Sequence, residues 1–352
     1  MKETKKICNE LDFIIYILLL FYMLVDCVTG LLGMYGIAGI SQPYKMLLMF
    51  LMVLSLKSYI GAIIYFYFFG IVSLSLVMYF FNSYTNFSNS LAMQLRIIMA
   101  PVLFVFLKKQ YEKEPRKILN IIKANTIVLI GNLILGLLGF GDSTYKQGEA
   151  TYGIKGFFYD GNALSAILFV AYVLWINLRP KSKYKISIVF LFFGILVGTK
   201  VSVLSIILYF CAYNFFSVPY RKRFFTMLVL SLLISTLIYV LFQTSFFQYQ
   251  IARVKWLLTL FKGNYLSVIL SGRNLDLIEH YKFYQTNFST RELLFGFGFL
   301  NFTKIIELDF FDTFFSYGLL FFCGIFSFYF YCFLINRKNP KIVCFNLLFF
   351  LS

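Results

Sequence analysis

Long apolar stretches dominate this sequence and limit what the chain can fold into. A helix needs roughly 18 to 20 consecutive apolar residues to cross the hydrocarbon core of a bilayer, and the 352 residues contain about ten such stretches. Apolar residues make up 60% of the chain and charged residues 13%, a composition that excludes a set of soluble domains. We therefore expect an all-α polytopic membrane protein with about 10–11 transmembrane helices in a single membrane domain, residues 1–352.

The predicted spans follow one another closely until one long polar gap. We place them at 13–32, 44–56, 59–81, 91–107, 118–140, 161–178, 186–198, 201–217, 224–242 and 310–334, with a shorter apolar remnant at 342–352. The first residues, MKETKK before an apolar run, imitate a secretory signal, but no small-residue cleavage site follows. We interpret this segment as an uncleaved first helix.

The charges are strongly unbalanced, with 32 Lys and Arg against 15 Asp and Glu and a net charge of +17. In a soluble chain this excess would indicate a nucleic acid partner. Here the dense basic clusters lie between spans, at 108–117, 179–185, 220–223 and 337–341. With the N-terminus in the cytoplasm all four lie inside, as the positive-inside rule requires. The charge therefore predicts orientation and no nucleic acid partner.

The outward segments in this topology are 82–90, 141–160 and a large outer loop, 244–308. The six cysteines lie in or beside the predicted helices without a CxxC pair, and the chain has no phosphate-binding glycine loop. We expect no disulfide framework, no metal site and no cofactor. The large loop is where chemistry has room to happen.

Two parts of the large loop show helical spacing. Residues 247–262 predict an amphipathic helix along the outer interface, or one that merely covers the helix bundle. Residues 271–287 predict a second amphipathic helix, for which Gly272 allows the turn and Asn274 or Ser271 supplies the cap.

On the second helix Arg273, Asp276 and His280 fall at i, i+3 and i+7, so they form one stripe. Arginine stays protonated and offers a rigid fork of donors that suits phosphate oxygens, which makes Arg273 a candidate for binding an anionic leaving group. The alternative is a solvated polar face. For His280, the only histidine, a capping or hydrogen-bonding role competes with a chemical one.

The loop ends at a group of glycines and acids. Gly296 and Gly298 permit a tight approach to the membrane, and Glu307, Asp309 and Asp312 lie at the outward start of the tenth span. The helix dipole accounts for one or two acids at such a place whatever their function. A carboxylate here is also a candidate general base for an acceptor hydroxyl. A divalent metal would lack a further ligand set in the sequence.

Ionisable residues at the edges of spans are costly and each calls for an explanation. Three lie toward the outer leaflet in this topology: Asp26, Arg96 and Lys200. An outward-facing anion pocket would then be surrounded by four bases: Arg96, Lys200, Lys155 of the 141–160 segment, and Arg273. Snorkelling, or a structural ion pair with Asp26 or Asp160, is the competing interpretation.

Several of these segments together resemble the family of bacterial O-antigen and capsular polysaccharide polymerases and O-antigen ligases. The order, spacing and topology of the matching pieces run through most of the chain. They are DCVTGLLG (26–33), QPYK (42–45), GIKGFFYDGNALSA (153–166), VGTK (197–200), SGR (271–273), LLFGFGF (293–299) and ELDFFDTFFSYG (307–318).

The resemblance implies a polytopic membrane fold of the GT-C glycosyltransferase type, acting on glycans carried by undecaprenyl diphosphate. Arg273 resembles the loop arginine of the SGR motif that binds the diphosphate, Lys155 and Asn162 fall in the earlier loop motif, and Lys200 resembles a basic residue at a helix hairpin. Ligases of the family usually have a histidine where this chain has ELD, 307–309. That departure favours a polymerase and leaves His280 without a family role.

We therefore expect a polysaccharide polymerase in the cytoplasmic membrane of a bacterium, with its active face outside. Its partners would be the lipid-linked glycan donor and acceptor, membrane lipid, a flippase and a chain-length regulator. The expected catalytic residues are Arg273, Glu307, Asp309 and Asp312, and the expected substrate-binding residues are Arg96, Lys155, Asn162, Lys200, Asp276 and His280. The alternatives are a ligase of the same family, separable only by its acceptor, and a lipid-linked oligosaccharide flippase or other transporter, which should show pseudo-repeated halves or a charged midplane cavity.

Overall fold

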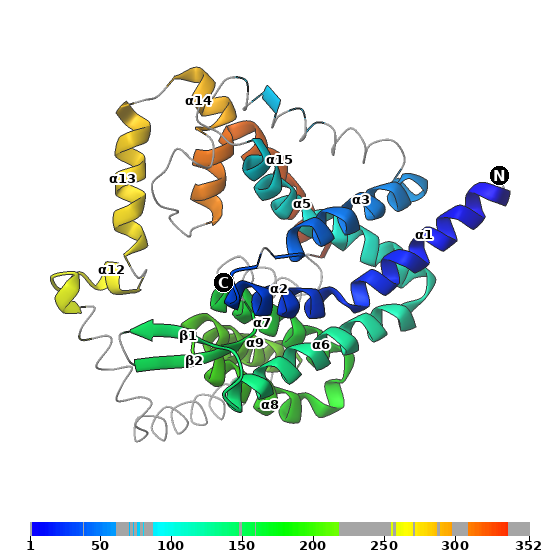
Figure 1. Ribbon diagram of the computed structural model, residues 1–352, viewed down its shortest axis with the longest axis horizontal. Helices are drawn as coiled ribbons and strands as arrows, with labels where there is room; N and C mark the ends of the chain where they lie inside the picture. The colour runs from blue at the N-terminus through cyan, green and yellow to red at the C-terminus, as the bar shows by residue number, and fades with distance from the viewer. Residues whose placement is uncertain are drawn as a thin grey trace. The chain divides into compact units, whose positions relative to one another are not determined.

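The computed structural model is mainly helical and includes a β-hairpin (Figure 1). It describes residues 2–37, 39–60, 70, 73, 76–77, 80, 87–147, 150–158, 160–217, 255, 258–269, 272–286, 289–297 and 309–336. Two compact units divide the chain: residues 1–66, 98–218 and 333–352 form the first, and residues 67–97 and 219–332 form the second. Most of the predicted spans 59–81 and 224–242, the remnant 342–352 and most of the amphipathic segment 247–262 lie outside the described residues.

The first unit holds most of the predicted spans as helices. Its elements are α1 (Lys2–Leu20), α2 (Tyr22–Met34), α3 (Ser41–Ile60), the later part of α5 (Phe87–Lys113), α6 (Pro115–Leu137), β1 (Asp142–Gln147), β2 (Ala150–Gly156), α7 (Gly161–Leu178), η1 (Pro180–Ser182), α8 (Lys183–Val197) and α9 (Lys200–Ser217).

Two helices of the described residues, α6 and α7, are long and apolar enough to cross a membrane. The predicted first span is divided, because α1 and α2 meet at Phe21 with a bend of 48°, and this pair counts as a third candidate span. Shorter apolar helices cover 41–56, 201–217 and 311–327. The mainly helical architecture is thus confirmed, with two or three candidate membrane spans among the described residues, and the all-α prediction needs one correction, the hairpin of β1 and β2.

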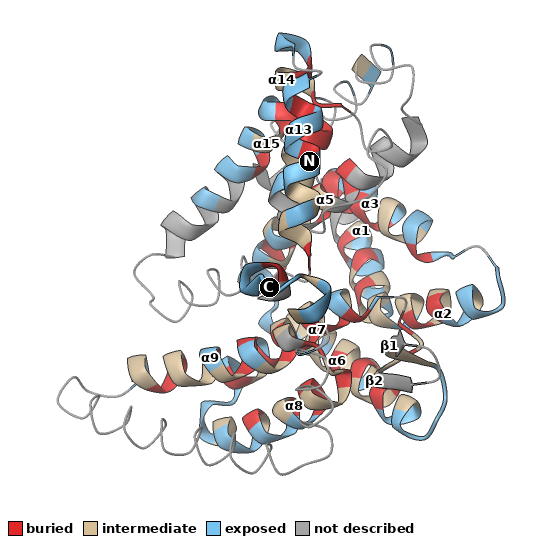
Figure 2. Cartoon of the chain, turned by 90° about the vertical axis from the view of Figure 1, so that its left-hand side faces the viewer, coloured by how far each residue is buried: buried red, intermediate tan, exposed pale blue. Residues whose placement is uncertain are grey.

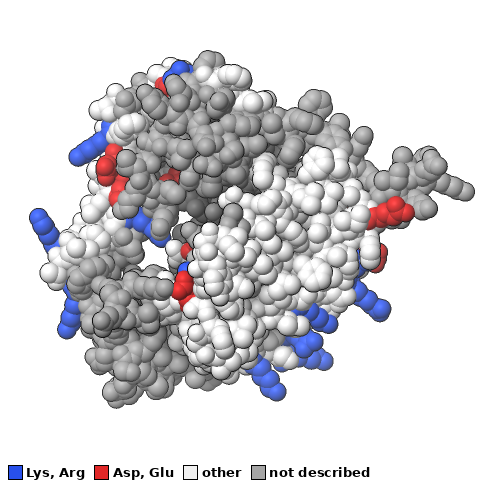
Figure 3. All heavy atoms as spheres, in the orientation of Figure 1, with Lys and Arg blue, Asp and Glu red and all other residues white. Residues whose placement is uncertain are grey.

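The helices of the first unit alternate in direction, which sorts its polar segments to two ends. Trp175 Nε1 near the end of α7 donates to Thr126 Oγ1 in the middle of α6 at 2.9 Å, and Lys183 Nζ at the start of α8 donates to Asn214 Oδ1 near the end of α9 at 2.6 Å. The end of α6 lies against β2, which precedes α7, so the start of α6 lies toward the end of α7. The basic clusters 108–117 and 179–185 therefore lie at one end of this unit. Figure 3 shows Lys and Arg gathered over this part of α6 and α8, at the lower right.

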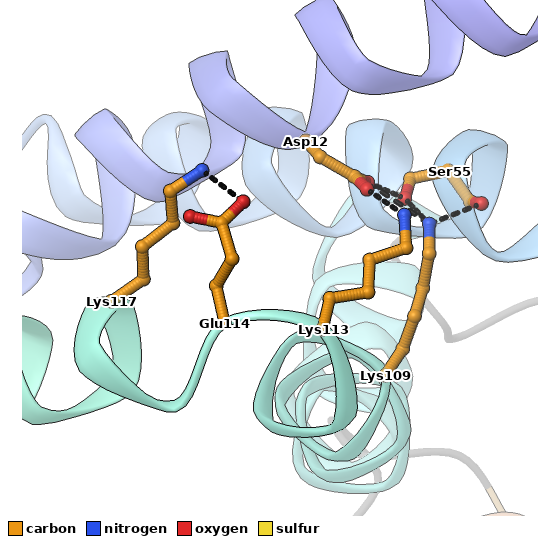
Figure 4. Close-up of polar contacts among 6 residues, drawn as sticks. All are labelled: Asp12, Ser55, Lys109, Lys113, Glu114 and Lys117. Carbon is orange, nitrogen blue, oxygen red and sulfur yellow. Dashed lines mark hydrogen bonds and ion pairs between the residues drawn. The ribbon is translucent and has the colours of Figure 1, made fainter.

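A buried ionic cluster lies near the same end, where α1, α3 and α5 meet (Figure 4). Asp12 Oδ1 accepts from Lys109 Nζ at 2.9 Å and Asp12 Oδ2 from Lys113 Nζ at 3.0 Å, while Ser55 Oγ accepts from Lys109 at 2.7 Å. The Lys109 side chain is only 3% exposed, whereas that of Lys113 is 47% exposed. Lys109 therefore joins three helices, a role that the orientation argument for 108–117 did not predict.

The core of the first unit is aromatic and lies mainly between α7, α8 and α9. Tyr172, Phe169 and Tyr209 are fully buried or nearly so, and their rings meet edge to face at about 6 Å. The Tyr172 hydroxyl is satisfied by Ser187 Oγ at 2.9 Å, and Tyr209 by Asn177 Nδ2 at 2.9 Å. Figure 2 shows the buried residues on the facing sides of these helices.

Where the structure describes it, the second unit includes the start of α5 and the helices α12 (Tyr265–Ile269), α13 (Arg273–Thr286), α14 (Thr290–Phe295) and α15 (Asp309–Asn336). Tyr284, Phe297 and Phe315 form its buried aromatic cluster, so α13, the turn after α14 and α15 pack together. The predicted tenth span, 310–334, corresponds to α15, which is broken at Gly318.

Candidate functional site

The hairpin end of the first unit gathers the segments 141–160 and 197–200. Thr144 Oγ1 on β1 donates to the carbonyl of Val197 at the end of α8, at 2.7 Å. A Cβ added at Gly161, the first residue of α7, would contact the Thr144 side chain. The hairpin, the end of α8 and the start of α7 therefore meet at one place. Glycines occur there because larger residues would not fit.

Lys155 lies on β2 and is held from two sides. Its backbone carbonyl accepts from Asn132 Nδ2 on α6 at 3.0 Å, and Asn132 Oδ1 accepts from the Phe157 N–H at 2.8 Å. Its ammonium lies 3.7 Å from Asp142 Oδ2 on β1, and its side chain is 18% exposed. The position of this lysine is thus fixed by a buried asparagine far away in the sequence.

Asn162 follows an N-cap on α7. Asp160 accepts from the backbone N–H groups of Asn162 at 2.9 Å and Ala163 at 3.3 Å. Asp160 therefore caps a helix, a role different from the ion pair that the sequence left open for it. The Asn162 side chain is exposed at the hairpin end.

Lys200 begins α9 after a tight turn. Gly198 ends α8 in the left-handed region with φ 77°, and Thr199 Oγ1 caps α9 by accepting from the Ser202 N–H at 3.1 Å. Thr199 Oγ1 also lies 2.6 Å from Ser165 Oγ on α7. The turn is therefore rigid, and it brings Lys200 to the same end of the unit as Lys155 and Asn162; the Lys200 side chain itself lies outside the described residues.

Asp26 has a different partner from those considered in the sequence. It forms an ion pair with Lys45 at 2.8 Å and accepts from Ser41 Oγ, and Lys45 also lies 5.1 Å from the Tyr22 ring centre. Lys45 belongs to the QPYK segment, but its ion pair with Asp26 was not predicted from the sequence. Arg96 lies on α5 in the second unit, and its side chain lies outside the described residues.

The predicted cap of α13, Asn274, is not the residue that caps this helix. The Gly272 carbonyl accepts from the Leu275 N–H at 2.9 Å, and Gly272 has φ 87°. Asn274 is not the cap, because it is already the second helical residue and its Nδ2 donates to Ser267 Oγ on α12 at 2.9 Å. Ser271 lies outside the described residues. The amide instead joins α13 to α12.

The predicted stripe of Arg273, Asp276 and His280 lies on α13 with unequal exposure. Arg273 and Asp276 are half-buried, whereas His280 is only 6% exposed. His280 Nδ1 lies 2.8 Å from the carbonyl of Asp276, and its ring stacks on Phe315 of α15 at a centroid distance of 6.4 Å. These contacts favour a structural role for His280.

Two of the three predicted carboxylates lie in the first turn of α15. Asp309 and Asp312 are i and i+3 and share a face, and Asp312 is half-buried. Glu307 lies outside the described residues, as does the side chain of Asp309. Phe315, one turn after Asp312, is the residue on which His280 stacks. The structure thus brings the helix of Arg273 into contact with the helix of Asp312.

One acidic residue that the sequence did not single out is buried in the same unit. Glu292 on α14 is 7% exposed; its Oε1 accepts from Arg291 Nε at 2.9 Å and Nη2 at 2.6 Å. Its Oε2 has no hydrogen-bond partner among the residues that the structure describes. Burial raises the pKa of the nearby Tyr284, and the charge of Glu292 raises it further. Nothing in the local sequence TREL indicated burial.

The arrangement suits chemistry on an anion without a metal ligand set. In the described part of the chain no group of three or more His, Cys, Asp or Glu residues is placed to hold a metal ion. The second unit offers a permanent cation at Arg273, which can stabilise a developing negative charge, and carboxylates at the start of α15, which can accept a proton. The hairpin end of the first unit, taken by itself, offers Lys155 and Lys200.

A match to a known protein family falls mainly in the second unit. Residues 248–339 match the family described as O-antigen ligase like membrane protein. This range contains α12, α13, α14 and α15, hence Arg273, Glu292, Asp309 and Asp312. No curated protein and no solved structure matches the chain. The resemblance noted in the sequence is therefore confirmed for the large loop and the helix that follows it.

Proposed function

We propose that this protein, which carries an O-antigen ligase-like membrane domain at residues 248–339, is a polysaccharide polymerase. It joins oligosaccharide repeat units carried by undecaprenyl diphosphate on the outer face of the bacterial cytoplasmic membrane. The observation that supports this most is the contact between α13 and α15 through His280 and Phe315 inside the matched range. That contact keeps the helix of a phosphate-binding arginine beside the helix of two carboxylates.

The roles follow from the chemistry of the substrate. The hydroxyl oxygen of the acceptor sugar bonds to the anomeric carbon of the donor, the bond from that carbon to the diphosphate oxygen breaks, and the hydroxyl proton is removed. Arg273 stabilises the negative charge on the departing diphosphate. Lys155, Lys200 and Arg96 are the further bases proposed to bind the substrate. The sugar diphosphate already carries its activation, so the reaction needs no cofactor.

A carboxylate at the start of α15 takes the proton in this proposal. Asp312 and Asp309 are the candidates within the helix, and Glu307 precedes it. A general base must come within hydrogen-bond reach of the acceptor hydroxyl. Asn162 and Asp276 complete the proposed substrate contacts. His280, predicted as a substrate-binding residue, instead acts by positioning α13, because its ring is buried against Phe315.

A polymerase is preferred over a ligase because the ELD segment stands where family ligases usually have histidine. The ligase would hand the finished glycan to another acceptor by the same chemistry. A flippase would move the lipid-linked unit without joining it. A flippase and a chain-length regulator are proposed as working partners, because polymerisation needs units outside and a limit to their number.

The test is deletion followed by analysis of lipid-linked glycans. The proposal expects single repeat units to accumulate on the carrier. Full-length polymer left on the carrier would indicate a ligase, and units trapped on the inner leaflet would indicate a flippase. Arg273→Ala, at normal protein level, should reproduce the deletion. Lys282→Ala, an exposed base on the same helix, is the matched control and should restore wild-type polymer.

A further inference from the structure

The carboxylate of Glu292 is buried, and among the described residues only one of its two oxygens has hydrogen-bond partners. Its side chain is 9% exposed, Oε1 is bound by the Arg291 guanidinium, and Oε2 has no hydrogen-bond partner among the described residues. A buried acceptor without a partner is costly, and a charged one more so. A carboxylate held in this state suits a ligand that brings a hydrogen-bond donor.

The surroundings of Glu292 keep it in place. Arg291 is 50% exposed, so the guanidinium that holds Oε1 reaches the surface. The backbone carbonyl of Glu292 accepts from the Gly296 N–H at 2.8 Å, which fixes α14 to the turn that follows. Tyr284 lies within electrostatic reach of Glu292 and packs against Phe297 and Phe315. The carboxylate therefore belongs to the packed part of the unit, and the Arg291 guanidinium bound to it is the part of this pair that is exposed.

The charge of Glu292 selects the chemical class of its ligand. An ionised carboxylate only accepts hydrogen bonds, so its ligand must donate. Negative charge repels a diphosphate, and the metal-ligand groups needed for a cation do not occur among the described residues. A sugar offers hydroxyl donors without negative charge. The observations therefore point to a sugar hydroxyl.

The position along α13 separates this group from the proposed diphosphate site. Tyr284, beside Glu292, follows Arg273 by 11 residues on the same helix. At 1.5 Å per residue that separation is about 16 Å. Glu292 is thus too distant to act on the bond next to a diphosphate held at Arg273. It is placed to contact a sugar further along the glycan.

We propose that Glu292 is a specificity-determining residue that accepts a hydrogen bond from a hydroxyl group of the glycan, away from its diphosphate end. This proposal rests on the proposed polymerase function. Arg291 holds one oxygen of the carboxylate, and the other oxygen binds the sugar. Glu292 thereby contributes to recognition of the repeat unit and leaves the chemical step to the groups at the other end of α13.

The experiment uses the full chain in detergent and lipid-linked repeat units extracted from cells that lack the protein. KM and kcat for chain elongation are measured for wild type, Glu292→Gln and Glu279→Gln. Glu279 is an exposed acid on α13, so its substitution is the matched control. Loss of one hydrogen bond to a charged group predicts a KM about 10- to 100-fold higher for Glu292→Gln, with kcat within about twofold of wild type. Glu279→Gln should match wild type.

Each outcome has one interpretation. A Glu292→Gln protein with wild-type KM, or with a loss of kcat at unchanged KM, overturns the proposal. If wild type joins no repeat units, the proposed polymerase function fails instead. If Glu292→Gln does not fold, Glu292→Asp keeps the charge but withdraws the oxygen from the sugar. That variant should also raise KM, and wild-type KM in it would overturn the proposal.

Discussion

Gly296 and Gly318 lie against each other, and both have the same unusual backbone conformation. Gly296 has φ 77° and ψ 178°, and Gly318 has φ 74° and ψ −179°. A Cβ at Gly296 would overlap the backbone of Ser316 and Tyr317, and a Cβ at Gly318 would overlap the backbone of Leu294 and Gly296. The turn after α14 therefore passes directly over the break in α15, where the Phe297 N–H donates to the Phe315 carbonyl at 2.9 Å.

Gly318→Ala should weaken the second unit. This region of backbone conformation is accessible almost only to glycine, so a side chain there costs about 1–3 kcal/mol before any overlap is counted. The overlap is with backbone atoms, which cannot rotate away. We expect a lower midpoint of thermal unfolding in detergent and a loss of polymer, because this crossing holds together the turn after α14 and α15, against which Tyr284 of α13 packs. Gly296→Ala should act in the same direction.

Gly324→Ala is the matched control in the same helix. Nothing lies within 4 Å of a Cβ added there, and an alanine in a helix is favoured over glycine by about 0.5–1 kcal/mol. The control should therefore be neutral or slightly stabilising. Equal unfolding midpoints for the Gly318 and Gly324 variants would show that the crossing contributes nothing to stability.

Lys109 and Lys113 contact the same carboxylate but should differ in their effect on stability. Lys109→Ala removes a buried partner of Asp12 and leaves the carboxylate with less compensation, so we expect a loss of about 3–5 kcal/mol. Lys113→Ala removes a pair whose lysine is 47% exposed, and solvent screening limits its contribution to about 0–1 kcal/mol. Thermal unfolding and the yield of folded protein in membranes measure both.

A double variant separates charge compensation from packing. Replacing Asp12 and Lys109 together by apolar residues of similar size should recover most of the stability that Lys109→Ala loses, because a buried pair is often replaceable by well-packed apolar groups.

Equal losses for Lys109→Ala and Lys113→Ala would contradict the assignment of Lys109 as the buried partner.

The sequence predicted the helices far better than their irregularities. The spans 161–178 and 201–217 correspond closely to α7 and α9, because an apolar run bounded by polar residues leaves the backbone no alternative in a membrane. Both irregularities, the bend at Phe21 and the break at Gly318, are accompanied by contacts with other segments. At the bend, Asn125 of α6 accepts from the Met23 N–H and donates to the Leu19 carbonyl, and the break at Gly318 lies against Leu294 and Gly296. The hairpin at 142–156 also escaped prediction, because its strands are short and polar and are held by Asn132 and Val197 from distant helices.

The site residues show the same division. Helical spacing placed Arg273, Asp276 and His280 on one helix, and that part of the prediction was confirmed. The spacing could not reveal that His280 stacks on Phe315, since their contact joins residues 35 positions apart. Burial of Glu292 likewise depends on how α14 is packed, which no local pattern encodes.

Asn132 holds the hairpin to α6 through two hydrogen bonds. Its side chain is 4% exposed and bonds both the Lys155 carbonyl and the Phe157 N–H. Asn132→Ala would leave these two partly buried backbone groups without their partners, at a cost of about 1–3 kcal/mol. The hairpin should then open more often, and trypsin should cleave within 141–160 about 10-fold faster or more in the purified protein. Elongation should fall as well, because Lys155 is no longer held in place.

Asn120→Ala is the control for this prediction. Asn120 lies on the same helix, is exposed, and makes one long hydrogen bond of 3.5 Å to the Tyr16 hydroxyl. Its loss should change neither cleavage nor elongation. If Asn132→Ala and Asn120→Ala are cleaved at the same rate, the hairpin is held by the Thr144 contact with Val197 and by strand pairing alone. In that case Thr144→Val should be the variant that opens it, since valine keeps the shape of the side chain but cannot donate to the Val197 carbonyl.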